Sequence, residues 1–85
     1  MSKVQLYTTT FCPFCLAAKA ILDQKGVNYD EIDLSSEPDI KSKIMEEYKW
    51  STVPIIVIDD ELIGGYRELK ALVRTNKLDE KLGLT

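Results

Sequence analysis

The stretch Phe11-Cys12-Pro13-Phe14-Cys15 holds the only two cysteines of this 85-residue chain. Pro13 suits the first turn of a helix, where its missing N–H leaves no hydrogen bond unmade. Val4 to Thr8, just before it, has the Val, Leu and Tyr typical of a short strand. The cysteines are therefore expected at the start of a helix that follows a strand. A redox pair, half of a metal site and buried packing are all compatible with that position.

The spacing of hydrophobic residues along the rest of the chain predicts the element order β-α-β-α-β-β-α. The β-α-β unit is expected to be parallel with a right-handed crossover, and an Asp59-Asp60 turn joins the last two strands. An α/β fold with one mixed four-stranded sheet and helices on both faces follows. The expected strands are Val4–Thr8, Tyr29–Leu34, Pro54–Ile58 and Glu61–Ile63. The first expected helix runs from the cysteines to Lys25-Gly26. The second begins at a capping box of Ser36 and Asp39 and continues through Ile40, Ile44, Met45 and Tyr48, and the third contains Leu69, Leu72 and Val73. A final helix or docked tail is expected at Leu78, Leu82 and Leu84.

Length and composition predict one compact domain over residues 1–85. The chain is 29% charged with a net charge of −3, which argues against binding to nucleic acid. No apolar run approaches the roughly 18 residues of a membrane span, and the first residues lack the apolar core of a signal peptide. The expectation is a cytoplasmic protein, by default a monomer, with no membrane contact.

The chain has no histidine, which excludes Ser-His, Cys-His and His-metal chemistry. The partial positive charge of a helix start favours a thiolate at Cys12, which would then be the nucleophile. Cys15, one turn further in, would be the more buried resolving thiol. Zinc normally takes four ligands, so a metal site built on these two cysteines would need a second chain or an external thiol. Buried packing stays open, although Pro13 favours an exposed position for Cys12.

Three motifs at matching spacing resemble glutaredoxins of the dithiol kind, across about residues 3 to 75. They are Cys12-Pro13-Phe14-Cys15, Thr52-Val53-Pro54 and Ile63-Gly64-Gly65. The resemblance implies a thioredoxin-like fold and a glutathione-dependent oxidoreductase, acting in electron transport and cell redox homeostasis. Its substrates would be protein disulfides and glutathione–protein mixed disulfides. Cys12 and Cys15 would be catalytic and form the redox-active disulfide, with glutathione as reductant and no metal.

The resemblance also implies a glutathione-binding groove. The peptide bond before Pro54 would be cis, which exposes the backbone N–H and C=O of Val53 to the cysteine of glutathione. Backbone N–H groups at the start of the third helix would bind the glutamyl carboxylate, and Glu68 would meet its amine. The glutathione-binding residues expected in this way are Phe14, Lys41, Thr52, Val53, Pro54, Gly65, Tyr66, Arg67 and Glu68.

This sequence departs from the family at three positions of that groove. Thr9 stands where the family has a lysine, Tyr66 replaces a small residue or cysteine, and Arg67 adds a positive charge. Lys41 can still supply a positive charge for the carboxylate at the glycine end of glutathione. The loss of one exposed charge contact is worth only about 0.2–1 kcal/mol, so glutathione binding is expected to be altered rather than abolished.

Two other functions remain open. One is a dimer that holds a [2Fe-2S] cluster through Cys12 and two glutathiones. Relatives of that kind mostly carry a CGFS motif, which Pro13 and Cys15 do not match. The other is a redoxin reduced by thioredoxin reductase, which the altered groove would allow.

Overall fold

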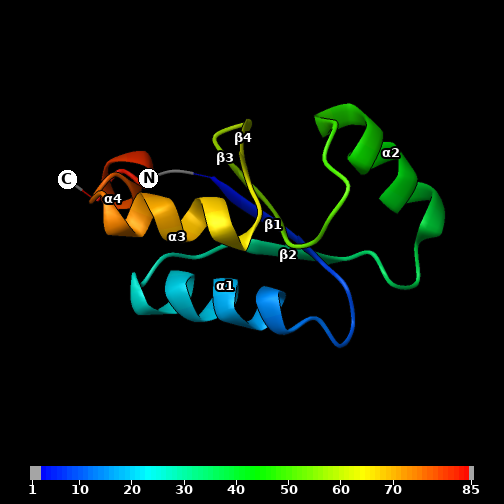
Figure 1. The fold of residues 1–85 in the computed structure, drawn as a ribbon, viewed down its shortest axis with the longest axis horizontal. Helices are drawn as coiled ribbons and strands as arrows, with labels where there is room; N and C mark the ends of the chain where they lie inside the picture. The colour runs from blue at the N-terminus through cyan, green and yellow to red at the C-terminus, as the bar shows by residue number, and fades with distance from the viewer. Residues whose placement is uncertain (1–2, 85) are drawn as a thin grey trace.

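The computed structural model describes residues 3–84; Met1, Ser2 and Thr85, at the ends of the predicted 1–85 domain, lie outside the described residues. The observed order agrees with the predicted one, with a short fourth helix at the end (Figure 1). The strands are β1 (Val4–Thr8), β2 (Asp30–Asp33), β3 (Ile55–Ile58) and β4 (Glu61–Gly64). The helices are α1 (Pro13–Gln24), α2 (Pro38–Tyr48), α3 (Tyr66–Arg74) and α4 (Leu78–Lys81).

The four strands form one mixed sheet in the order β2-β1-β3-β4. β1 and β2 pair in parallel, whereas β3 pairs antiparallel with both β1 and β4. Asp59 and Asp60 make the predicted turn between β3 and β4, both with positive φ. A tight turn of this kind has the twist that a hairpin needs. The mixed four-stranded sheet predicted from the sequence is thus confirmed.

Alternate residues of the strands point to opposite faces of the sheet and build two hydrophobic clusters. One face packs against α1, α3 and α4, and the other packs against α2, as the placement of the helices in Figure 1 also shows. The prediction of helices on both faces is correct. The buried residues of the first cluster are Val4, Leu6, Ala18, Leu22, Ile56, Ile58, Leu69, Leu78 and Leu82. Those of the second are Tyr7, Leu34, Ile55 and Val57.

The predicted capping box at Ser36 and Asp39 is wrong. The helix begins at Pro38, and Glu37 occupies the N-cap position without a side-chain hydrogen bond. Pro38 fixes φ near the helical value and has no N–H to satisfy, so it starts the helix without a capping side chain. The neighbouring Ser35 links the loop before α2 to the loop after β1, because its hydroxyl accepts a hydrogen bond from the N–H of Thr10 at 2.6 Å.

Several elements differ in extent from the prediction: β3 begins at Ile55 rather than Pro54, and β4 extends to Gly64 rather than Ile63. β2 is shorter than the expected Tyr29–Leu34, although Leu34 is buried directly after it. The expected C-terminal element is a docked helix of one turn, in which Leu78 and Leu82 are buried. Leu84 is 47% exposed and does not join that core.

Strand pairing brings three distant loops to one end of the sheet. Tyr7, near the end of β1, pairs with Ile55 at the start of β3, and Ile56 pairs with Gly64 at the end of β4. The loop after β1, the loop before β3 and the turn after β4 therefore meet. These are the segments that carry the three motifs of the sequence.

Candidate active site

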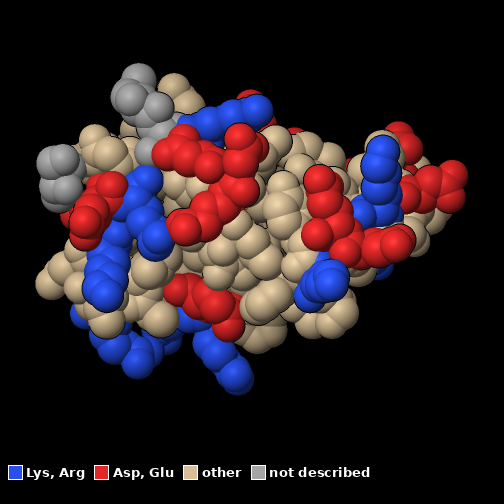
Figure 2. Space-filling model, turned by 90° about the horizontal axis from the view of Figure 1, so that it is seen from above, with Lys and Arg blue, Asp and Glu red and all other residues tan. Residues whose placement is uncertain are grey.

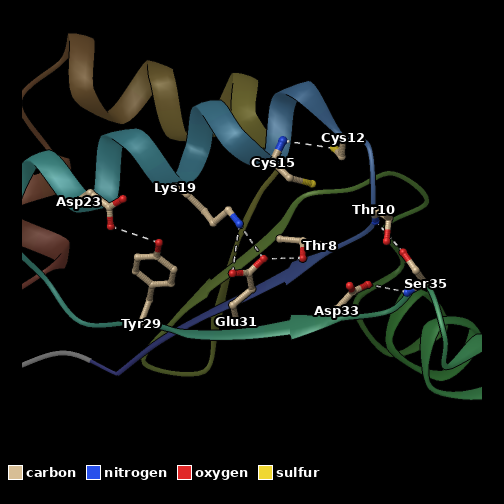
Figure 3. A network of polar contacts seen from close by, with 10 residues as sticks. All are labelled: Thr8, Thr10, Cys12, Cys15, Lys19, Asp23, Tyr29, Glu31, Asp33 and Ser35. Carbon is tan, nitrogen blue, oxygen red and sulfur yellow. Dashed lines mark hydrogen bonds and ion pairs between the residues drawn. The ribbon is translucent and has the colours of Figure 1, made fainter.

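Cys12 occupies the N-cap of α1 in extended conformation, with φ −108° and ψ 101°. Its sulfur accepts a hydrogen bond from the N–H of Cys15 at 3.2 Å (Figure 3). The Cys12 thiol also points to the carbonyl oxygen of Val53, 3.9 Å away. The Sγ atom thus lies at the N-terminal end of α1, the position that the sequence predicted for Cys12.

Cys15 lies in a different environment one turn further into α1. It is 2% exposed, against partial exposure for Cys12. Burial, and then the hydrogen bond with Cys12, raise the pKa of the Cys15 thiol to about 12, although the Thr9 backbone and Lys19 act in the opposite direction. Cys15 is therefore protonated at neutral pH. The prediction that it is the more buried thiol is confirmed.

A polar network lies between α1 and the sheet, next to Cys15 (Figure 3). The Lys19 ammonium donates hydrogen bonds to both carboxylate oxygens of Glu31 on β2, at 2.9 and 3.2 Å. The hydroxyl of Thr8, at the buried end of β1, donates to Oε2 of Glu31 at 2.9 Å. The hydrogen bond to Glu31 raises the pKa of Lys19. The network holds a positive charge one helical turn from the Cys15 thiol.

A cavity of about 750 Å³ lies beside the cysteines and includes Val53, the contact of Cys12. Its volume is in the range of small-molecule pockets. The predicted glutathione-binding residues Phe14, Thr52, Val53, Pro54, Gly65, Tyr66, Arg67 and Glu68 all line it, together with Trp50, Lys70 and Arg74. Lys41, on α2, is not among the lining residues. The structure thus brings together all members of the predicted set except Lys41.

The walls of this cavity come from the start of α1, the loop before β3, and the turn that leads into α3 together with α3 itself. The Val53–Pro54 peptide bond is cis, as the resemblance implied. The indole ring of Trp50 lies against Gly64 and Gly65. The rings of Phe14 and Tyr66, which also line the cavity, are in contact, with centroids 5.8 Å apart. Tyr66 therefore packs the start of α3 against the first turn of α1.

Glu68 has a role that the sequence did not reveal. Its Oε1 atom accepts a hydrogen bond from the N–H of Gly65 at 2.9 Å and so closes the first turn of α3. The N–H groups of Tyr66 and Arg67 belong to that first turn, where no intrahelical acceptor exists. A carboxylate in the cavity can bind such groups.

Lys70 and Arg74 are lining residues that were not predicted from the sequence. They follow Arg67 by three and seven residues on α3, which places all three on one face of the helix. This spacing is the sequence signal that could have identified Lys70 and Arg74 as lining residues. The signal is usable only when the face of α3 that meets the groove is already known.

Two features are absent from the described part of the chain. In residues 3–84, no helix has the length and apolar character needed to cross a bilayer. Within the same range, no three His, Cys, Asp or Glu side chains are grouped so that they could hold a metal ion.

Comparison with known proteins agrees with this geometry. The glutaredoxin family model matches residues 4–63. A glutaredoxin of Pseudomonas aeruginosa is 39% identical over 82 residues, which cover 96% of this chain and 98% of that protein. The crystal structure of wheat glutaredoxin superimposes with a TM-score of 0.89 at 30% identity, covering 96% of this chain and 80% of the other.

A buckwheat glutaredoxin–glutathione complex gives the same TM-score of 0.89 at 28% identity, over 96% of this chain and 77% of that one. The thioredoxin-like fold is therefore established. Family model, relatives and fold agree: the chain belongs to the glutaredoxin family of thiol–disulfide oxidoreductases.

Proposed function

We propose that this protein uses glutathione to reduce protein disulfides and glutathione–protein mixed disulfides through Cys12 and Cys15. The observation that carries the proposal is the position of the Cys12 sulfur. It lies at the N-cap of α1, accepts a hydrogen bond from the N–H of Cys15, and faces the carbonyl oxygen of Val53 at the edge of the cavity. A thiolate there can attack a disulfide whose other half lies in the cavity.

The first step is attack of the Cys12 thiolate on one sulfur of the substrate disulfide. A new S–S bond forms to Cys12, and the other half of the substrate leaves as a thiolate that takes up a proton. Two routes then release Cys12. A glutathione thiolate attacks a Cys12–glutathione adduct and yields oxidised glutathione, or Cys15 loses its proton, displaces the bound thiol and closes the Cys12–Cys15 disulfide.

The second route ends when two glutathione molecules reduce the internal disulfide and become oxidised glutathione. The burial of Cys15 supports a role as resolving thiol rather than nucleophile, because a protonated buried sulfur does not compete with Cys12 for substrate. The cytoplasmic location, the monomeric state and the absence of a metal stay predictions.

Glutathione binding to the cavity is supported by the lining residues. The backbone of Val53 offers an N–H and a C=O to an extended peptide, and the start of α3 offers N–H groups to a carboxylate. A related protein, the buckwheat glutaredoxin, was crystallised as a glutathione complex. Arg67 adds a cation at the α3 end of the cavity, and Thr9 is not among the lining residues.

The test is mass spectrometry of a Cys15→Ser variant incubated with oxidised glutathione. We expect one glutathione adduct, mapped to Cys12, and no adduct on a matched Cys12→Ser variant. If Cys12 reacts with a small alkylating agent but takes up no glutathione, the proposal is refuted. Reduction of the oxidised protein by thioredoxin reductase would then identify the alternative electron source, and visible absorbance after anaerobic purification would identify a cluster.

A further inference from the structure

Three cationic side chains line one side of the cavity. Arg67, Lys70 and Arg74 lie on α3 at positions i, i+3 and i+7, which form one face of the helix. All three are exposed. At about 1.5 Å rise per residue, Arg74 lies about 10 Å along the axis from Arg67. The row therefore begins at the glutathione end of the cavity and leads away from it.

Within residues 3–84, no ion pair neutralises these cations. The ion pairs of that range engage Lys19, Lys25 and Lys81. Glu68 is the acidic residue of the cavity lining, and its Oε1 is held by the N–H of Gly65. Figure 2 shows basic side chains gathered along one edge at the end of the molecule that holds α3 and α4. This concentration occurs in a chain whose net charge is −3.

Glutathione alone does not match this charge. At neutral pH it carries two carboxylates and one ammonium group, hence one net negative charge. The cavity lining carries three cations and one carboxylate, hence two net positive charges. One positive charge remains in excess when glutathione is bound, and Lys70 and Arg74 lie beyond the helix start at which its carboxylate would bind.

The surface around Cys12 fits a protein partner. Phe11 is 98% exposed, Phe14 61% and Leu16 65%, all within four residues of the sulfur. Large exposed apolar side chains grouped in this way are typical of interaction sites. A protein bound over Cys12 would extend past the cavity and along α3, where the basic row faces it.

We propose that Arg67, Lys70 and Arg74 select protein substrates that carry Asp or Glu next to the reactive cysteine. This inference rests on the proposed glutathione-dependent reduction and names its substrate class. The acidic side chains would pair with the row on α3 while the glutathione half of the mixed disulfide occupies the cavity. Opposite charges of this kind act mainly on the encounter and orientation of the partners.

The experiment compares two synthetic peptides, each with one cysteine in mixed disulfide with glutathione. They differ only in the flanking residues, which are Glu in one and Gln in the other. The kcat/KM for each peptide is measured at low ionic strength with the wild-type protein, a Lys70→Gln/Arg74→Gln variant and a Lys43→Gln control on the exposed surface of α2. Thermal unfolding checks that the variants are folded.

We expect the wild-type protein to prefer the Glu peptide about two- to tenfold, the range for two or three exposed charge pairs. The preference should decrease as salt is added, because exposed pairs are screened. The Lys70/Arg74 variant should lose it, and the Lys43 control should keep it.

Two results would overturn the inference while leaving the proposed function in place. One is equal kcat/KM of the wild-type protein for both peptides. The other is a Lys70/Arg74 variant that loses the same factor in kcat/KM on both peptides, which would mean that the cations serve glutathione alone. A wild-type protein that reduces neither peptide would refute the glutathione-dependent activity itself, and this inference with it.

Discussion

Lys19 lies one helical turn beyond Cys15 on α1, and its position is fixed from the sheet. Glu31 accepts two hydrogen bonds from its ammonium group, and Thr8 holds Glu31 in turn. The positive charge lowers the pKa of Cys15, which burial has raised to about 12. The charge of Lys19 also acts on Tyr29 and Asp33, which lie before and in β2, and it favours a lower pKa of both groups. The ammonium group is thus placed to stabilise the thiolate that Cys15 must become.

At the residue scale, Lys19→Gln should slow the step in which Cys15 displaces a thiol from Cys12. The reactive thiolate fraction of Cys15 rises about tenfold per pH unit below its pKa, so the wild-type rate should increase with pH through neutrality. The variant raises that pKa further, and its rate should be about two- to fivefold lower at each pH. Stopped-flow release of thionitrobenzoate from a preformed Cys12 adduct measures the step.

Three variants serve as controls for that measurement. Lys19→Arg keeps the charge and should restore the rate, and Cys15→Ser should show no release at all. Lys25→Gln, at the other end of α1, breaks an ion pair with Asp79 and should leave the rate unchanged. Equal rates and equal pH profiles for Lys19→Gln and the wild-type protein would show that the charge does not act on Cys15.

At the scale of elements, the turn from β4 into α3 determines the shape of the cavity. Gly64 has φ +120°, a conformation that side chains rarely adopt. A Cβ atom there would lie 2.8 Å from Cγ of Glu68 and 3.1 Å from Cη2 of Trp50. The Glu68 side chain also closes the first turn of α3. A glycine is therefore required both by the backbone and by the close packing around it.

Gly64→Ala should be more destabilising than Gly26→Ala. Gly26 also has positive φ, +71°, but nothing lies within 4 Å of its added Cβ. Backbone conformation alone should cost Gly26→Ala about 1–2 kcal/mol. Gly64→Ala adds the steric conflict and should exceed that value. Urea midpoints with unchanged slopes measure both free energies of unfolding, and equal losses would contradict the packing argument.

At the scale of the whole molecule, the C-terminal segment completes the core. Helix α4 has only four residues, yet Leu78 and Leu82 are buried against the cluster formed by β1, β3, α1 and α3. An isolated helix of one turn has no stability of its own. Its position therefore comes from tertiary contacts, which are these two buried side chains and the surface ion pairs of Asp79 with Lys25 and of Lys81 with Glu61.

Leu78→Ala should lower the free energy of unfolding by about 2–5 kcal/mol, a large share of the roughly 5–15 kcal/mol of a typical domain. Leu84→Ala is the matched control, since Leu84 is 47% exposed and its truncation should stay within about 0.5 kcal/mol. Chemical denaturation of both variants checks this. A Leu78 variant as stable as the control would show that α4 contributes nothing to the core.

The sequence by itself determined the elements and most of the cavity. Pro13 marked the start of α1, and the apolar run at 54–58 marked β3, because these signals depend only on neighbours along the chain. The three motifs indicated the family, and with it all lining residues except Trp50, Lys70 and Arg74. The predicted start of α2 was wrong because two signals a few residues apart compete there, and the helix begins at Pro38 rather than after a cap at Ser36.

Only the tertiary structure decided which side chains from distant segments meet. Glu31 is twelve residues from Lys19 and reaches it because the parallel pairing of β1 and β2 places it beneath α1. The cations of α3 face the cavity because that helix packs beside α1 on one side of the sheet. Side-chain periodicity is a local property of helix and strand geometry, whereas these contacts depend on strand order and on the direction of each connection.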